Sequence, residues 1–235
     1  MNLLQQILLP GFAVRSDAFF SNFYAPGSLQ MVKDSLMKMV RDDAFTAVYL
    51  CGVKDSGKSH LLQAICNYAE EQGKTSLYLP LREIKNFTPS EILENTSDSD
   101  VICLDDIDVV AGNLPWEEAL FHLYNQCQVS GCTLVMSAGV TVNELPLNLP
   151  DLQTRLSACL VLPVLPVCEE DKAGLVRFSA HHTGMQMNDA CVQFIINHSG
   201  RSVAELVKVV ERLDRESLVA GRKITVPFIK DVFGW

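Results

Sequence analysis

The stretch Gly52-Val53-Lys54-Asp55-Ser56-Gly57-Lys58-Ser59 fills every fixed position of the phosphate-loop pattern G-x-x-x-x-G-K-[ST]. In this pattern the two glycines let backbone N–H groups turn inward around an anion, and the lysine places a positive charge on the outer phosphates. Ser59 offers a hydroxyl to Mg²⁺ at the start of a helix, while residues 53–56 occupy the variable positions. We therefore expect residues 52–59 to bind a nucleoside phosphate. His60, which adjoins the loop, is a further candidate contact or simply begins the helix.

The segments on either side of this loop support the interpretation. Residues 46–51 form a short apolar run rich in β-branched and aromatic side chains, and residues 60–66 begin a helical pattern. The loop thus lies between a predicted strand and a predicted helix, which is the context that the pattern requires. Accident should produce such a pattern in only about one percent of chains of this length. A plain glycine turn is therefore the weaker alternative.

Composition and charge restrict the class of protein. With 235 residues and 48% hydrophobic side chains, the chain can bury a full core. The formal net charge of -9 argues against nonspecific binding to nucleic acid, which requires clustered positive charge. We also expect no direct sequence-specific binding to DNA. The eight cysteines form no C-x-x-C pair, which favours reduced thiols in a cytosolic protein. Without a basic N-terminal leader or a long apolar run, we expect a cytoplasmic protein with no membrane partner.

A second candidate motif follows 47 residues after Lys58, since 105 − 58 = 47. Residues 101–104 are apolar and precede two carboxylates, Asp105 and Asp106, which predicts a buried parallel strand with acids at its carboxyl end. Asp105 would join the Mg²⁺ shell, and Asp106 could orient or deprotonate a water molecule that attacks the terminal phosphate. Alone, such a run more often ends in a solvated turn. After a phosphate loop at this distance, the nucleotide-site interpretation is favoured.

Further apolar strands are predicted at residues 76–79, 133–137 and 159–162, with helical patterns between them. Five strands alternating with helices predict a three-layer α/β fold with a parallel sheet. After residue 166 the strand signals fade and helical patterns take over. We expect an N-terminal tail at 1–15, a nucleotide-binding domain at 16–166 and a small all-α lid at 167–235. Two apolar helix faces are predicted to be buried: Leu120, Leu123, Tyr124 and Cys127, and Val203, Leu206, Val207, Val210 and Leu213.

A nucleotide-binding sheet domain followed by a helical lid resembles the AAA+ ATPases. Four segments are similar to the ATPase part of the DnaA family: Phe20-Ser21-Asn22-Phe23-Tyr24, Asp105-Asp106-Ile107, and residues 117–125 and 149–156. After the lid the chain leaves no room for the helix-turn-helix domain with which DnaA binds DNA. The chain therefore resembles the Hda family of DnaA-homologous regulators, and residues 170–172, 213–215 and 224–230 extend this resemblance through the lid.

The resemblance implies an adaptor. Hda-like proteins bind ADP, dock on the DNA polymerase β sliding clamp loaded on DNA, and trigger ATP hydrolysis by DnaA, which prevents re-initiation of replication. The clamp contact would fall on Gln6-Ile7-Leu8-Leu9-Pro10, which resembles the family's clamp peptide, with Gln6 and Leu9 as anchors. A glutamine amide and aliphatic side chains in an extended segment can fill a shallow apolar pocket. The alternative is a tail that packs on its own domain.

Arg155 aligns with the arginine finger of the DnaA-like proteins. The resemblance implies that this side chain reaches the γ-phosphate held by a neighbouring subunit and stabilises the charge of the transition state. The alternative is a surface arginine near the carbonyl groups of a helix end.

The lid departs from the DnaA pattern at one position. Ala204 stands where the family's lid carries a sensor arginine, and Arg201 lies three residues earlier, where it could substitute. Ser137 is the polar candidate at the first-sensor position. The departure favours a bound diphosphate over a cycling ATPase. The competing hypothesis is an autonomous AAA+ ATPase, such as a helicase loader or remodelling factor, and the sequence leaves homo-oligomerisation and base preference open.

Overall fold

The computed structural model describes residues 14, 17–42, 44–93, 96, 99–200 and 202–235. The chain divides into two compact units, Met1–Leu165 and Pro166–Trp235. The predicted clamp peptide, Gln6 to Pro10, and Arg201 lie outside the described residues. Within the part of the chain that the structure describes, none of the helices combines the length and apolar character that crossing a bilayer requires.

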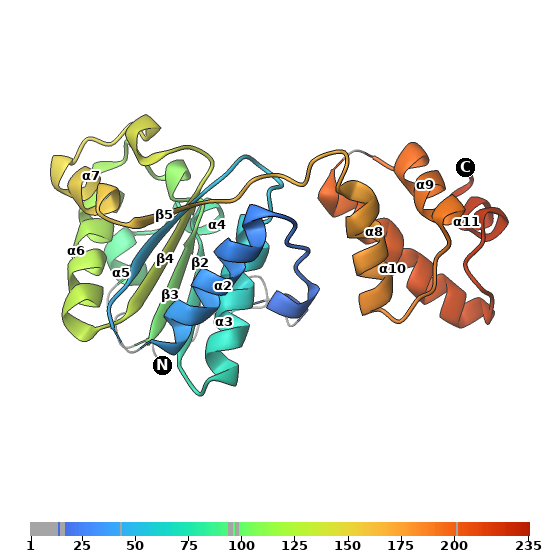
Figure 1. Ribbon diagram of the computed structural model, residues 1–235. Helices are drawn as coiled ribbons and strands as arrows, with labels where there is room; N and C mark the ends of the chain where they lie inside the picture. The colour runs from blue at the N-terminus through green and yellow to red at the C-terminus, as the bar shows by residue number, and fades with distance from the viewer. Residues whose placement is uncertain (1–13, 15–16, 43, 94–95, 97–98, 201) are drawn as a thin grey trace. The chain divides into compact units, whose positions relative to one another are not determined.

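A five-stranded parallel sheet forms the centre of the first unit, with the strand order β2-β3-β4-β1-β5 (Figure 1). The strands are β1 Ala47–Cys51, β2 Ser76–Pro80, β3 Val101–Asp105, β4 Thr133–Ala138 and β5 Leu160–Pro163. The predicted fold class is confirmed, and the strand bounds differ from the predicted ones by about one residue, the usual uncertainty of element ends. Because all strands run the same way, their carboxyl ends meet at one edge of the sheet, where α/β proteins bind ligands.

One face of the sheet is covered by α2 (Ser28–Arg41) and α3 (Lys58–Glu71), with the short helix η1 (Phe20–Asn22) beside them. Successive side chains of a strand point to opposite faces, so alternate residues of β1 serve different cores. Val48 and Leu50 are fully buried against this helix pair. This face therefore holds the helix that follows the phosphate loop.

The opposite face of the sheet carries a second, larger core, to which Tyr49 of β1 contributes. It packs against α4 (Leu81–Ile84), α5 (Pro89–Leu93), α6 (Leu114–Ser130) and α7 (Pro150–Ser157). The turns η2 (Ile107–Val109) and η3 (Val142–Glu144) lie on the same side and supply buried residues. The two faces complete the predicted three-layer architecture (Figure 1).

Helix α6 illustrates how local sequence sets an element. A proline in its first turn suits the helix start, and Gly131 ends the helix in the left-handed conformation, with φ 81°. The predicted apolar face is confirmed, because its four members are all buried: Leu120, Leu123, Tyr124 and Cys127. That face packs α6 onto the sheet and leaves its other flank for α7.

The second unit is all-helical and consists of α8 Lys172–His182, α9 Asp189–His198, α10 Val203–Ala220 and α11 Val226–Phe233. Ser202 and Glu205 form a reciprocal capping box at the start of α10. Of the predicted apolar stripe, Leu206, Val210 and Leu213 are buried, whereas Val203 and Val207 are half-buried. The stripe is thus the inner face of the longest lid helix, as its spacing predicts.

Candidate nucleotide-binding site

The phosphate loop leaves the carboxyl end of β1 and enters α3, as the sequence context predicts (Figure 1). Two of its positions accept only glycine without rearrangement. A Cβ atom at Gly52 would stand 2.3 Å from the Val164 carbonyl oxygen and 2.8 Å from Ser56 Oγ. Gly57 has φ +99°, and a Cβ there would lie 2.8 Å from the ring of Phe23. The glycines therefore permit a close backbone approach that side chains would prevent.

The interior of the loop combines a buried cation with a buried polar atom. Lys58, 7% exposed, donates from Nζ to the carbonyl oxygens of Gly52 and Val53 at 2.6 and 3.0 Å. Ser56 Oγ is buried, and no hydrogen-bond partner for it exists among the described residues. A buried hydroxyl without a partner is costly in a folded protein. The donors of the loop therefore fit an anionic group such as a phosphate.

Asp105 lies at the end of β3 and is 5% exposed. Both carboxylate oxygens accept hydrogen bonds, Oδ2 from the Tyr78 hydroxyl at 2.7 Å and Oδ1 from the Ser137 hydroxyl at 2.5 Å. Burial, and after it the charge of Asp105, raises the pKa of the Tyr78 phenol far above its ordinary value, so this hydroxyl remains a donor. The carboxylate is thus held in one orientation at the ligand-binding edge of the sheet.

Tyr78 is a site residue that the sequence interpretation missed. It lies in β2, and the β2–β3 register pairs it with Cys103, two residues before Asp105. Only the order of the strands brings its hydroxyl to the acid. The available signal in the sequence was a tyrosine between two leucines in a predicted strand.

Asp106 occupies a strained position beside this network. Its φ of 58° is uncommon for a residue other than glycine, and its backbone N–H donates to Ser137 Oγ at 3.0 Å. Its Oδ2 accepts from Nε of Arg82 at 2.9 Å, in an ion pair in which the arginine side chain is 64% exposed. The acid predicted to orient water therefore has a cationic partner in α4 that the sequence did not indicate.

Ser59 and Asp105 are the predicted magnesium ligands. Ser59 is exposed in the first turn of α3, and Asp105 ends the strand β3. The described residues contain no group of three or more His, Cys, Asp or Glu side chains arranged for a metal ion. A magnesium ion at this edge would thus rely on nucleotide phosphates and water for most of its ligands, which is how Mg²⁺ is commonly held beside phosphates.

The remaining loop positions differ in their surroundings. Val53, Lys54 and Asp55 are exposed, and Asp55 has φ 63°. His60 lies 3.2 Å through Nε2 from the Phe19 carbonyl oxygen, and its ring centroid is 5.5 Å from that of Phe23. His60 therefore joins α3 to the segment that precedes α2, as well as following the loop.

Arg155 belongs to a different part of the unit. It lies in the last turn of α7, is half-buried, and its guanidinium carbon stands 5.9 Å from the ring centroid of Phe121 and 5.6 Å from that of Tyr124. Both rings belong to α6, on the face of the sheet opposite α3. The structure thus places the loop, Asp105, Asp106 and Ser137 at the carboxyl edge of the sheet. Arg155 lies apart from them, in α7 beside the rings of α6.

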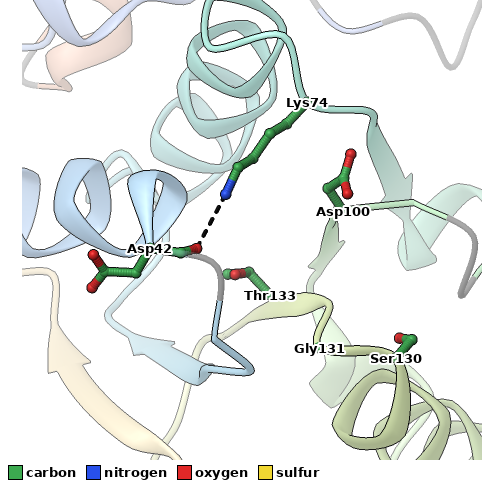
Figure 2. Close-up of a pocket in the computed structure, with 6 residues that line it drawn as sticks. All are labelled: Asp42, Lys74, Asp100, Ser130, Gly131 and Thr133. Carbon is green, nitrogen blue, oxygen red and sulfur yellow. Dashed lines mark hydrogen bonds between the residues drawn. The ribbon is translucent and has the colours of Figure 1, made fainter.

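A small polar pocket of about 130 Å³ lies at the other end of the strands (Figure 2). It is lined by Asp42, Lys74, Asp100, Ser130, Gly131 and Thr133. Inside the pocket Lys74 Nζ donates to the Asp42 carbonyl oxygen at 3.1 Å, and Asp100 accepts a hydrogen bond from the N–H of the adjoining Thr75 at 2.7 Å. This pocket lies between the segments before β1, β2, β3 and β4 and shares no residue with the phosphate loop.

Comparisons with known proteins extend these observations. The family model described as the bacterial DnaA ATPase domain matches residues 17–163, and that described as the Hda lid domain matches residues 169–233. An uncharacterized protein of Haemophilus influenzae is 34% identical over 229 residues, covering 97% of this chain and 98% of that protein.

Solved structures share the fold at low identity. Domain III of the replication initiation protein DnaA from Thermotoga maritima has a TM-score of 0.75 at 18% identity, covering 94% of this chain and 98% of that one. AMPPCP-bound DnaA from Aquifex aeolicus has a TM-score of 0.72 at 14% identity, covering 88% and 68%. Because the DnaA ATPase-domain model spans more than half of the sequence and the Hda lid model spans most of the remainder, the chain belongs to the DnaA-like AAA+ proteins of the Hda type and is a DnaA-related replication regulator.

Proposed function

We propose that this chain is an ADP-bound adaptor that docks on the DNA polymerase sliding clamp and stimulates ATP hydrolysis by DnaA. The observation that carries the proposal is the setting of Arg155. Its guanidinium stacks on two rings of α6, whereas α3 and the phosphate loop belong to the other face of the sheet. An arginine held apart from its own nucleotide site suits action on the nucleotide of a partner, where an arginine finger stabilises transition-state charge.

The nucleotide of this chain would serve as a structural ligand. The glycine contacts, the buried Lys58 and the unpartnered Ser56 hydroxyl fit phosphates, and Ser59 with Asp105 would complete a magnesium site. Binding of ADP and Mg²⁺ would stabilise the folded unit by mass action. Identification of the nucleotide that remains bound after gentle purification tests this part, and a protein that retains no nucleotide would contradict it.

Two features favour slow hydrolysis by the chain itself. Asp106 forms an ion pair with Arg82, which competes with any role in orienting water. Ala204, at the family's sensor-arginine position, is exposed and carries no charge. The intact loop and the Asp105-Asp106 pair nevertheless favour one competing function, an autonomous AAA+ ATPase such as a helicase loader. Fast steady-state ATP turnover by the isolated chain, without DnaA, would support that function over ours.

The clamp contact is proposed for Gln6 to Pro10. The glutamine amide would supply one polar contact and Leu9 an apolar anchor, which suits an extended peptide in a shallow pocket. A pull-down with the sliding clamp should fail when Gln6→Ala and Leu9→Ala are combined. Undiminished capture of the clamp by that double variant would refute the assignment.

The decisive experiment measures DnaA-bound ATP hydrolysis with DNA-loaded clamp. Arg155→Ala should reduce stimulation on the order of 1000-fold, the usual contribution of an arginine finger, while nucleotide and clamp binding persist. Arg41→Ala is the matched control, because Arg41 is an exposed arginine of α2 on the other face of the sheet. If Arg155→Ala and Arg41→Ala stimulate DnaA equally, the arginine-finger mechanism is wrong.

A further inference from the structure

Glu117 is a fully buried carboxylate in the first turn of α6. It accepts three backbone hydrogen bonds, through Oε1 from the Gly112 N–H at 2.7 Å and through Oε2 from the N–H groups of Asn148 and Leu149 at 2.9 and 2.7 Å. Burying a charge without partners is expensive, and these donors compensate for lost hydration. The three hydrogen bonds join two backbone segments that are distant in the sequence to one side chain.

Glu117 fixes the backbone segment that immediately precedes α7. Leu149 is the residue that immediately precedes that helix and acts as its N-cap, although its side chain forms no cap. The Asn148 side chain adds a bond from Nδ2 to the Gly112 carbonyl oxygen at 2.9 Å. The segment before α7 is thereby tied to the loop before α6, at a point where α7 lacks a capping side chain of its own.

The far end of α7 is held by the same face of α6. Glu117, Phe121 and Tyr124 fall at i, i+4 and i+7, which places them on one side of the helix. The guanidinium of Arg155 lies over these two rings, with its central carbon 5.9 and 5.6 Å from the ring centroids. Helix α7 has only eight residues, so its two ends rest on one continuous stripe of α6.

We propose that Glu117 is a positioning residue for Arg155. Its carboxylate sets where α7 begins, the rings of Phe121 and Tyr124 set the direction of the guanidinium, and together they present Arg155 at a defined place on the surface of the unit. This inference rests on the proposed function of Arg155 and goes beyond it, because it assigns a role to a buried acid with no contact to any nucleotide site. Misplacement of a transition-state contact by a small distance costs much of its catalytic effect.

The test compares Glu117→Gln with Glu118→Gln, its exposed neighbour on the same helix. Both variants remove one negative charge, but only the first places an amide against backbone N–H groups. We expect Glu117→Gln to lower the maximal rate of DnaA-bound ATP hydrolysis on the order of 10- to 100-fold. The half-saturating concentration of the chain should change less than about 2-fold, because a contact made only in the transition state affects the maximal rate and not binding. Its ADP affinity should change equally little, because α7 lies on the face of the sheet opposite α3. Glu118→Gln should behave as the unmodified protein.

Two further measurements separate positioning from a general loss of structure. Amide hydrogen exchange at Asn148 and Leu149 should accelerate in Glu117→Gln and not in Glu118→Gln. At the other end of α7, Phe121→Ala should lower the maximal rate, whereas Tyr124→Phe, which keeps its ring, should retain it. A parallel loss of ADP affinity and maximal rate in Glu117→Gln would indicate a merely structural role and overturn the inference.

The two proposals fail in distinguishable ways. Full stimulation by Arg155→Ala overturns the proposed function. Loss of stimulation in Arg155→Ala, combined with a full maximal rate and unchanged amide exchange in Glu117→Gln, overturns only the positioning role. Loss in both variants, with unchanged half-saturation, supports both proposals.

Discussion

The candidate nucleotide site and the α6–α7 region both place hydrogen-bond donors around a negative charge, but the charge belongs to a proposed ligand in the first and to the protein in the second. The phosphate-loop motif supplies donors that fit an anion, and its determinants fall within the eight consecutive residues from Gly52 to Ser59. The α6–α7 region surrounds a protein carboxylate, Glu117, with backbone donors that come from Gly112 and from residues 148 and 149. The first arrangement is a local motif, and the second exists only after folding.

The two regions also differ in what removal of one group should do. Lys58, whose Nζ lies inside the phosphate loop, is proposed to contact the nucleotide, so its loss should act mainly on nucleotide affinity. Glu117 organises the protein itself, so its loss should act on the placement of α7 and leave the ligand site intact. Each prediction below tests whether a substitution in one region leaves the properties of the other region unchanged.

Among the variants of the nucleotide site, the largest effect is expected for Lys58→Ala. Loss of a charge-assisted contact to phosphate should weaken ADP binding by about 2–3 kcal/mol, or roughly 30- to 160-fold, by isothermal titration calorimetry. Lys54→Ala is the matched control, because Lys54 is an exposed lysine at a variable position of the same loop. If both variants bind ADP like the unmodified chain, the loop is not the nucleotide site. Amide exchange at Asn148 and Leu149 should remain unchanged in both.

A smaller effect is expected for Gly52→Ala. The new methyl group would meet the Val164 carbonyl oxygen at 2.3 Å, so the backbone must shift, at a cost of about 1–2 kcal/mol in the free energy of unfolding measured with urea. Gly139→Ala serves as the control, because the nearest atom to a Cβ there is Asp108 Oδ2 at 3.4 Å. Equal stability of the two variants would show that close packing at Gly52 is unimportant.

The smallest effect is expected for Tyr78→Phe, which deletes one donor to Asp105. The free energy of unfolding should fall by about 1 kcal/mol, the usual contribution of one buried hydrogen bond. Tyr124→Phe supplies the comparison in the other region, since it keeps the ring that lies beside the Arg155 guanidinium. Magnesium-dependent ADP affinity should decrease in Tyr78→Phe alone. A decrease in both variants would show that the two regions do not act independently.

Much of the architecture was predictable because buried parallel strands have continuous apolar runs and helices have periodic ones. Residues 101–105 and the face of α6 from Leu120 to Cys127 are examples, and both proved buried. Asp105 was predictable for the same reason, since it ends such a run. The hydrogen bonds of Asp105 and Asp106 were not predictable. The sequence did not indicate Tyr78 or Arg82, and it indicated Ser137 only as a sensor candidate, because strand order and register alone bring these segments together.

The sequence by itself predicted a nucleoside phosphate as the ligand and determined the layered fold and the family, because phosphate-binding motifs and core formation depend on short-range patterns of residue type. Tertiary structure alone decided which groups contact the acidic side chains. It pairs Asp106 with Arg82, orients Asp105 between Tyr78 and Ser137, and encloses Glu117 among the backbone donors that precede α7. These roles depend on hydrogen bonds between residues distant in the chain, whose geometry exists only once the sheet order and helix packing are set.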